Sequence, residues 1–296
     1  MDLSIFIVTV FCLVDDWLEG EPKLRQRGPQ PELADSEVLT IEIVGEFLGI
    51  DSEKDLFTYF RRHYGEWFPA LQEVHRTTFT RQAANLWVAK ERLWQHLLRR
   101  EIGFDPLFSL VDSFPVPVCR FARAYRCRLL PEESAFGYDE MNKQTFYGLR
   151  AHLRVCWPGV VVGFSLAPAN AHELSVAEGL LEGAKGWLLG DRNYWSPKLI
   201  GLLSEQGLDL LAPYKSKKKG EKRPWSRSLV QKRRRIETVF SQLRERYRAK
   251  RVRARDRWHL ASRWLRKVLS HTVGVYLCQQ KTGFSSPLRF SDLLID

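Results

Sequence analysis

Apolar residues recur every three or four positions through the first hundred residues, which is the spacing that gathers them on one face of a helix. Residues 5–14 form the first apolar run. A second periodic segment follows the Asp, Ser and Glu of residues 35–37, which suit a helix cap, and it stops at Gly49. The pattern predicts buried helices in this part of the chain.

The longest periodic segment covers residues 78–101, with Thr77 or Thr78 as its cap and Gly103 just beyond its end. It is predicted to be one long helix. Because no strand pattern interrupts the first hundred residues, the sequence predicts an all-helical N-terminal domain over residues 1–105.

The pattern changes after Pro106. Strands are predicted at 108–111, 146–157, 160–166, 187–190 and 208–212, and helices at 171–184, 196–206 and 231–250. Residues 113–145 show no clear period and are expected to be a long irregular excursion. Pro158 and Gly159 predict a hairpin between two of the strands. Alternating strands and helices indicate an α/β fold, a mixed sheet flanked by helices, over residues 106–296.

Charge is concentrated in one part of the chain. The formal net charge is +11, but residues 212–270 alone contain 22 Lys and Arg against 4 Asp and Glu. Trp225, Phe240, Tyr247 and Trp264 interleave with these charges, whereas disordered basic tails are poor in such residues. A folded basic block indicates a polyanion such as nucleic acid as partner, and a solvated basic tail is the weaker alternative.

The cysteines exclude two classes of site. All five are scattered without the close pairs of a zinc site or a disulfide framework, so they are expected to be buried thiols in a reducing compartment. Residues 5–14 lack a basic flank and a cleavage site and are too short to span a bilayer. The expected location is the cytoplasm, in association with nucleic acid and not with a membrane, and a weak signal peptide is the minor alternative.

Three acids among the 35 stand out. Asp112 and Asp191 each follow a short apolar run, so we expect them at strand ends, where a sheet delivers side chains to one edge. Glu237 lies among core-spaced residues of a basic helix and is expected to face inward. Carboxylates bind Mg²⁺, and two such ions about 3.5–4 Å apart support phosphodiester cleavage. For each Asp alone, the capping of a turn remains the commoner role.

Five segments then occur in one order: Val111-Asp112-Ser113-Phe114-Pro115-Val116, Tyr147-Gly148-Leu149-Arg150-Ala151-His152-Leu153, Pro168-Ala169-Asn170-Ala171-His172-Glu173, Gly190-Asp191-Arg192-Asn193-Tyr194 and Arg233-Arg234-Arg235-Ile236-Glu237-Thr238-Val239-Phe240. Over nearly the whole chain this order resembles the DDE transposases of bacterial insertion sequences, closest to the insertion-sequence 982 group. The resemblance implies a ribonuclease-H-like catalytic domain with Asp112, Asp191 and Glu237 as the catalytic, metal-binding triad.

The same resemblance implies the cofactor and the partners. Two Mg²⁺ ions, or Mn²⁺ in their place, would serve DNA cleavage at transposon ends and strand transfer into target DNA. The substrates would be double-stranded DNA, and the pairing of two ends implies a homodimer or a larger assembly on the DNA.

Three positions depart from the family pattern around the second and third acids. Val230 stands where the pattern has Tyr, Arg244 replaces a Lys, and Asn193 replaces a Gly after the second acid. Arg keeps the positive charge of Lys but carries it on a planar guanidinium in place of a compact ammonium group. Asn tolerates left-handed backbone conformations that otherwise favour Gly. None of these changes removes a predicted metal ligand.

The remaining basic and histidine residues have subordinate roles. The predicted DNA-binding residues are Arg150, Arg233, Arg244, Lys250, Arg251 and Arg253. His152 and His172 are interpreted as structural histidines with satisfied hydrogen bonds, and the alternative is that they orient the substrate or the edge of the sheet. The helix at 78–101 carries Lys90 among several basic residues, and its domain would either read the transposon ends or form a dimer.

Two other functions remain open from the sequence. One is a structure-specific nuclease on the same scaffold that performs no strand transfer. The other is a non-catalytic DNA-binding regulator derived from a transposase. Covalent insertion into target DNA separates the first from a transposase, and metal-dependent cutting separates the second.

Overall fold

The computed structural model describes residues 1–22, 24, 30–213, 226–251, 254–283, 289–290 and 293. These residues form two compact units. Unit 1 comprises Met1–Ile102, Leu243–Ala254 and Trp258–Asp296, and unit 2 comprises Gly103–Gln242 and Arg255–Arg257. The site residue Arg253 and the Trp225 of the basic block lie outside the described residues.

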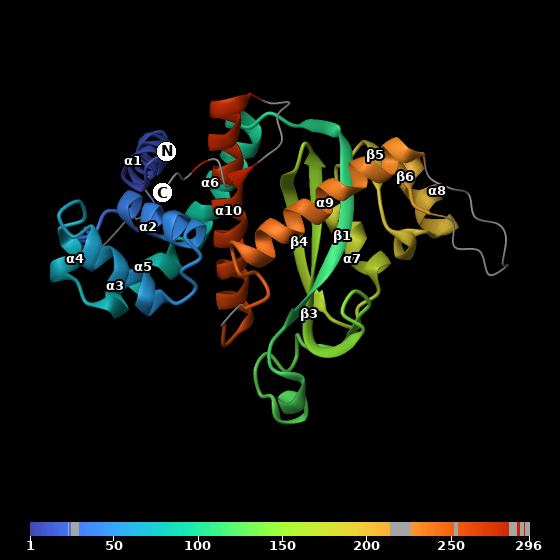
Figure 1. Cartoon of the computed structure of the whole chain (residues 1–296), viewed down its shortest axis with the longest axis horizontal. Helices are drawn as coiled ribbons and strands as arrows, with labels where there is room; N and C mark the ends of the chain where they lie inside the picture. The colour runs from blue at the N-terminus through green and yellow to red at the C-terminus, as the bar shows by residue number, and fades with distance from the viewer. Residues whose placement is uncertain are drawn as a thin grey trace. The chain divides into compact units, whose positions relative to one another are not determined.

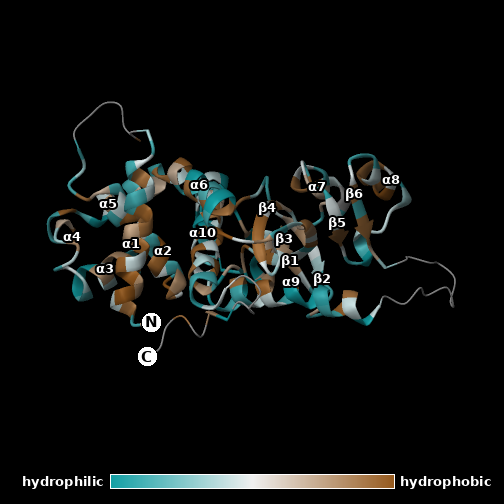
Figure 2. Cartoon of the chain, turned by 90° about the horizontal axis from the view of Figure 1, so that it is seen from above, coloured by the Kyte–Doolittle hydropathy of each residue, from teal (hydrophilic) through white to brown (hydrophobic). Residues whose placement is uncertain are grey.

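Unit 1 is helical throughout its described part (Figure 1). Its elements are α1 (Leu3–Glu19), α2 (Asp35–Phe47), α3 (Glu53–His63), α4 (Ala70–Glu73), α5 (Arg76–Asn85), α6 (Trp87–His96), the π-helical η1 (Leu97–Glu101) and α10 (Arg257–Thr282). Asp2 caps α1 by accepting a hydrogen bond from the Ser4 backbone. Much of α1 is brown in Figure 2, as its apolar sequence dictates. None of the described helices is both long and apolar enough to cross a membrane.

The segment 78–101 is not the single helix that its periodicity predicts. It is divided at Leu86, whose backbone (φ −81°, ψ 15°) leaves the helical region between α5 and α6. The cap is also different, because the His75 ring accepts a hydrogen bond from the Thr77 backbone. The apolar period is the same in a straight and in a broken helix, so the sequence pattern alone misses the break.

The C-terminal helix α10 belongs with the N-terminal helices, although its sequence position suggested the second domain. The reason is a buried network of ion pairs. Arg266 and Lys267 on α10 are buried, and they donate hydrogen bonds to Glu46 of α2 at 2.6 and 2.8 Å. Buried charges require such partners. These two cations are therefore part of the fold of unit 1 and are not exposed for DNA.

Lys90 is a second basic residue with a structural role. It was expected on a DNA-reading helix face, but its ammonium group is buried and donates to Glu42 at 2.8 Å and to the Ala83 carbonyl at 2.8 Å. Glu42 also accepts from Arg266. The charge count of the sequence thus overstates the cations available to a polyanion.

Unit 2 contains a six-stranded mixed sheet. Its strands are β1 (Asp105–Pro117), β2 (Ala135–Asp139), β3 (Gln144–Trp157), β4 (Val160–Pro168), β5 (Gly186–Leu189) and β6 (Leu208–Leu211). The order is β2-β3-β1-β5-β6, and β4 also pairs with β3. The predicted hairpin at residues 158–159 is the connection between β3 and β4.

Residues 113–145, expected as an irregular excursion, contain regular structure. β1 continues to Pro117 along β3, the 3-10 helix η2 spans Phe121–Arg126, and β2 pairs with the start of β3. Polar residues and prolines hide the alternation there. Strand pairing supplies the order that the local sequence does not show.

Helices cover both faces of the sheet. α7 (Glu173–Leu180) and α8 (Pro197–Glu205) pack their apolar residues around Val111 on one face. α9 (Arg227–Glu245) lies on the other face, where Phe240 contacts Phe114 at a ring distance of 4.9 Å. Figures 1 and 2 show the sheet between α9 and the pair α7 and α8.

Candidate active site

Asp112 lies inside a long strand, not at the end of a short one as the sequence suggested. It is paired with Leu153 of β3, and its side chain is 18% exposed. In the described strands, β1 pairs with β5 from Phe108 to Leu110 and no further. Asp112 therefore follows the point at which this edge of β1 becomes free.

Asp191 lies at the matching point of the neighbouring strand. β5 ends at Leu189, and Asp191 is the cap of the short 3-10 helix η3 (Arg192–Tyr194), where it accepts from the Asn193 backbone at 2.8 Å. β1 and β5 are parallel, and Leu110 pairs with Leu189. Continued by two residues, this register aligns Asp112 with Asp191 at one edge of the sheet.

Asn193 supports this arrangement with its side chain as well. Its amide nitrogen donates to the second carboxylate oxygen of Asp191 at 3.2 Å, in addition to the backbone bond. The residue that replaces the family's Gly thus holds Asp191 in place. Its backbone is part of η3.

Glu237 is exposed, in contrast to the predicted inward orientation. Ile236 and Val239 form the buried stripe of α9, and Glu237 lies about 100° around the helix from Ile236, at the margin of that stripe. Its position along the helix is nevertheless informative. It falls between Arg233, which approaches Asp112, and Phe240, which contacts Phe114.

Arg233 connects the basic helix to the acids. Its Nη2 lies 3.9 Å from Oδ2 of Asp112, and its charge lowers the pKa of both Asp112 and Asp191 against the effect of burial. Arg233 and Glu237 are four residues apart and share one face of α9. Glu237 is therefore on the face of α9 that also carries Arg233, and its side chain is exposed.

Glu173 is an acidic residue near Asp112 that no sequence pattern had indicated. It is the first residue of α7, and its Oε1 accepts a hydrogen bond from the Ser113 hydroxyl at 3.1 Å. Its Oε2 is buried without a hydrogen-bond partner among the described residues. Residues 168–173, which end in His172 and Glu173, are one of the five ordered segments, but only the fold shows that this segment returns to β1.

Arg150 lies next to this pair. One of its Nη atoms donates to the Ser113 hydroxyl at 3.3 Å, and the other donates to the Tyr138 carbonyl of β2. The prediction that Arg150 contacts DNA is untested, and in this structure its guanidinium joins two strands beside Asp112.

His152 is buried, and neither ring nitrogen has a hydrogen-bond partner among the described residues. The expectation of a satisfied structural histidine is wrong for this residue. Burial lowers the pKa of His152 to about 4, with a further contribution from Arg150. The ring is therefore neutral at physiological pH. His172, by contrast, is exposed.

Tyr194 is a buried residue on which three of the acids act electrostatically. Its side chain is fully buried, and its hydroxyl has no hydrogen-bond partner in the described part of the chain. Burial raises its pKa well above the ordinary value, and the charges of Glu173, Asp112 and Asp191 raise it further. The hydroxyl is thus a neutral donor close to three carboxylates.

The electrostatics of the acids suit a cation. Burial and then the charge of Asp191 raise the pKa of Asp112 to about 7, and the same two causes raise the pKa of Glu173 to about 7. Burial also raises the pKa of Asp191.

Within the described ranges, no three His, Cys, Asp or Glu side chains lie close enough together to hold a metal ion. The donor set consists of carboxylates, the ligands that Mg²⁺ prefers, and a divalent ion would stabilise their ionised forms.

The other predicted DNA-binding residues lie in unit 1. Arg244, Lys250 and Arg251 all fall within Leu243–Ala254. Arg244 and Lys250 are half-buried, and Arg251 is exposed. They do not belong to the compact unit that holds the acids.

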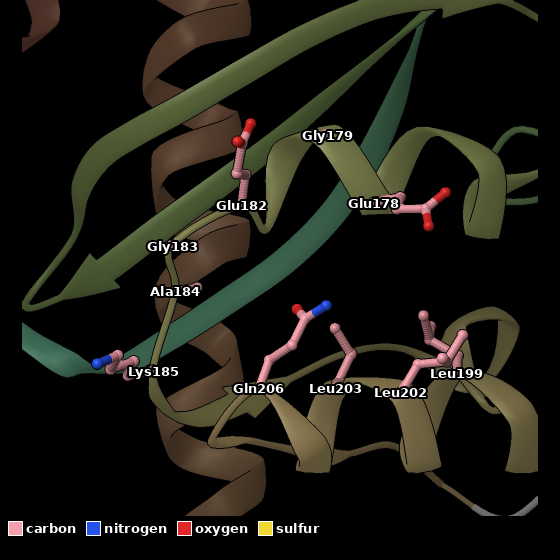
Figure 3. A pocket seen from close by; sticks show the side chains of 10 residues that line it. All are labelled: Glu178, Gly179, Glu182, Gly183, Ala184, Lys185, Leu199, Leu202, Leu203 and Gln206. Carbon is pink, nitrogen blue, oxygen red and sulfur yellow. The ribbon is translucent and has the colours of Figure 1, made fainter.

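A cavity of about 620 Å³ lies elsewhere in unit 2, between α7 and α8 (Figure 3). Leu199, Leu202 and Leu203 of α8 line one side, and Glu178 and Glu182 lie on the other. None of the residues singled out from the sequence lines it.

A comparison with protein families identifies the class of the chain. Residues 106–257, just over half of the 296 residues, match the family model of the transposase DDE domain. No curated protein matches the chain. A cryo-EM structure of the piggyBac transposase synaptic complex with hairpin DNA is similar over 97% of this chain and 76% of that chain, at 11% identity and a TM-score of 0.47.

Proposed function

We propose that this chain, which belongs to the transposase DDE domain family, cleaves double-stranded DNA at transposon ends and joins those ends to target DNA. The observation that carries the proposal is the alignment of Asp112 with Asp191 at one edge of the sheet, under the face of α9 that bears Arg233 and Glu237. Two acids from parallel strands and one from a helix across them can surround a scissile phosphate.

Asp112, Asp191 and Glu237 would hold two Mg²⁺ ions, or Mn²⁺ in their place, on a ribonuclease-H-like scaffold. When bound, the ions would activate the attacking hydroxyl and neutralise charge on the phosphate. The raised pKa values of Asp112 and Asp191, which are both half-buried, support this assignment, because such carboxyls gain most from a nearby cation.

The protein's own residues have separate tasks. Arg233 neutralises part of the charge at Asp112 and would position a phosphate there. Asn193 fixes the carboxylate of Asp191. We assign Glu173 a positioning role, since its hydrogen bond to Ser113 fixes the backbone next to Asp112.

The wider assignments belong to the same proposal. The five ordered segments support a place in the insertion-sequence 982 group of bacterial elements. The helical unit 1 would read the transposon ends or pair two protomers on the DNA, with Arg244, Lys250 and Arg251 contacting the phosphate backbone.

The experiment is a cleavage and joining assay on a duplex that carries the element's ends, with Mg²⁺ or Mn²⁺. Asp112→Asn, Asp191→Asn and Glu237→Gln should each abolish cleavage and leave duplex affinity largely intact. Asp209→Asn on β6, which removes an exposed carboxylate of the same sheet, is the matched control and should cleave as the wild type does.

Two outcomes would contradict the proposal. Cleavage without covalent insertion into target DNA would identify a structure-specific nuclease. Binding without cleavage under either metal would identify a DNA-binding regulator.

A further inference from the structure

Exposed aromatic rings gather in unit 2 on η2, on β2 and at the start of β3. Tyr125 is 85% exposed, Phe121 is 48% exposed and Phe136 is 41% exposed, although large apolar side chains are normally covered. Both Phe121 and Tyr125 contact Phe136, at ring distances of 6.4 and 5.3 Å, and Phe136 contacts Tyr147 at 5.1 Å. We call these four residues the aromatic surface.

The surroundings of the aromatic surface are basic. Arg120, Arg123, Arg126 and Arg128 are all exposed, and residues 118–131 contain no Asp or Glu. Two of these arginines lie within η2 together with Phe121 and Tyr125. A polyanion that also has flat apolar faces is complementary to such a surface, and nucleic acid is the biological polymer that combines both.

The sheet register relates the aromatic surface to the acids. Directly paired residues of antiparallel strands point to the same face, and residues two apart along a strand do so as well. Asp112 pairs with Leu153, and β3 runs from Leu153 back to Tyr147 without a bulge in its pairing to β1 or β2. Tyr147 pairs with Phe136. Phe136 and Tyr147 therefore lie on the same face of the sheet as Asp112.

The separation along β3 fits a nucleic-acid strand. Six residues separate Leu153 from Tyr147, which at about 3.3 Å per residue is roughly 20 Å. At the stacked spacing of about 3.4 Å per nucleotide that length corresponds to about six nucleotides, and an extended single strand covers it with fewer. One DNA strand can therefore extend from the acids to the aromatic surface.

We propose that the aromatic surface binds unpaired bases of the DNA strand that passes the acids, by stacking on Tyr125, Phe121 and Phe136. Bases within an intact duplex are already stacked on one another, so these rings select a single-stranded or frayed segment. The arginines around η2 bind the phosphates of the same segment. This inference rests on the proposed function for the identity of the strand, but the stacking itself requires no cleavage.

The test measures DNA affinity by fluorescence anisotropy in the absence of metal. The probes are a labelled single-stranded oligonucleotide of about 20 thymidines and a duplex of equal length. The variant is the double substitution Phe121→Ala and Tyr125→Ala, and Met141→Ala is the control because Met141 is 73% exposed on the turn between β2 and β3 without a ring. Tyr125→Phe keeps the ring and removes the hydroxyl.

The double variant should bind the single strand at least about fivefold more weakly, as the loss of one stacked base predicts. Its duplex affinity should stay at the wild-type value, and so should both affinities of Met141→Ala and Tyr125→Phe. Arg123→Gln with Arg126→Gln should weaken the binding of both probes and reduce the salt dependence by about two charges.

Three results would overturn the inference. The first is that the double variant binds the single strand as tightly as the wild type does. The second is that the double variant loses affinity equally for the single strand and for the duplex. The third is a change in oligomeric state by light scattering without a change in DNA affinity, which would assign the surface to a protein partner. End cleavage by the wild type is assayed separately, so a failure of stacking leaves the transposase proposal standing, and the reverse also holds.

Discussion

The Ser113 hydroxyl donates a hydrogen bond of 3.1 Å to Glu173, joining the strand that carries Asp112 to the first residue of α7. Glu173 also contributes to the raised pKa of Asp112 through its charge. The connection fixes the backbone beside the first acid and adds negative potential at the place where a cation would bind.

Glu173→Gln should therefore weaken Mn²⁺ binding by about 10–100-fold, the usual effect of removing a residue that orients a metal ligand. Isothermal titration calorimetry of the metal-free protein measures this directly. Glu178→Gln on the same helix removes an exposed carboxylate and is the matched control. Equal Mn²⁺ affinities in the two variants would contradict the positioning role of Glu173.

Arg233 provides a second test of the site. Arg233→Gln and Arg234→Gln each remove one cation from α9, and each should weaken duplex binding and lower the salt slope by about one. Because Arg233 lies 3.9 Å from Asp112 and Arg234 is exposed on another face, the cleavage rate at saturating DNA should fall for Arg233→Gln alone. Single-turnover kinetics at high DNA concentration measure that rate, and equal rates would show that Arg233 acts merely as a surface charge.

His152 predicts a dependence of stability on pH. Its pKa is lowered by burial to about 4 in the folded protein, against about 6.5 when unfolded, so between these values the unfolded chain binds more protons. The contribution of His152 to the free energy of unfolding is therefore fully present above about pH 6.5 and is lost as the pH falls toward 4. His152→Leu should remove this contribution, so that between pH 6.5 and 5 the wild type loses about 2 kcal/mol more stability than the variant.

Urea denaturation at several pH values measures the free energy of unfolding for both proteins. His172→Leu, which changes an exposed ring, is the control and should follow the wild type. Parallel pH profiles of wild type and His152→Leu would show that His152 is not buried in its neutral form.

The buried ion pairs of unit 1 predict a large stability effect. Glu46 is buried, and Arg266 and Lys267 lower its pKa against the effect of desolvation. Glu46→Ala would leave two cations buried without this partner and should cost about 3–5 kcal/mol. Glu53→Gln breaks the half-buried pair with Arg263 at 3.0 Å and should cost at most about 1 kcal/mol.

The free energy of unfolding, measured by urea denaturation at pH 7, distinguishes these two effects. A loss below about 1 kcal/mol for Glu46→Ala would show that the network contributes little to folding. The same network explains why the local charge of the sequence was a poor guide to the number of exposed cations, since Arg266 and Lys267 are enclosed by their partners.

Local signals in the sequence predicted several elements closely. The strand expected at 187–190 is β5 at Gly186–Leu189, and the hairpin expected at residues 158–159 joins β3 and β4. Both depend on short-range chemistry, an apolar run before a polar residue and a Pro-Gly turn. Asp112 and Asp191 also follow from short-range chemistry, because each ends such an apolar run.

Tertiary structure decided which residues meet. Glu173 is 61 positions from Asp112 in the numbering and shares no periodic pattern with it, yet α7 brings it to Ser113. β1 extends to Pro117 since β3 pairs with it, although its own residues past Asp112 gave no strand signal. The sequence by itself determined the helical and mixed α/β parts, the two aspartates and the family resemblance, because periodicity and motifs are local. The fold alone decided that α10 joins the N-terminal helices and that a fourth acid adjoins the site, because burial and charge pairing depend on contacts between distant segments.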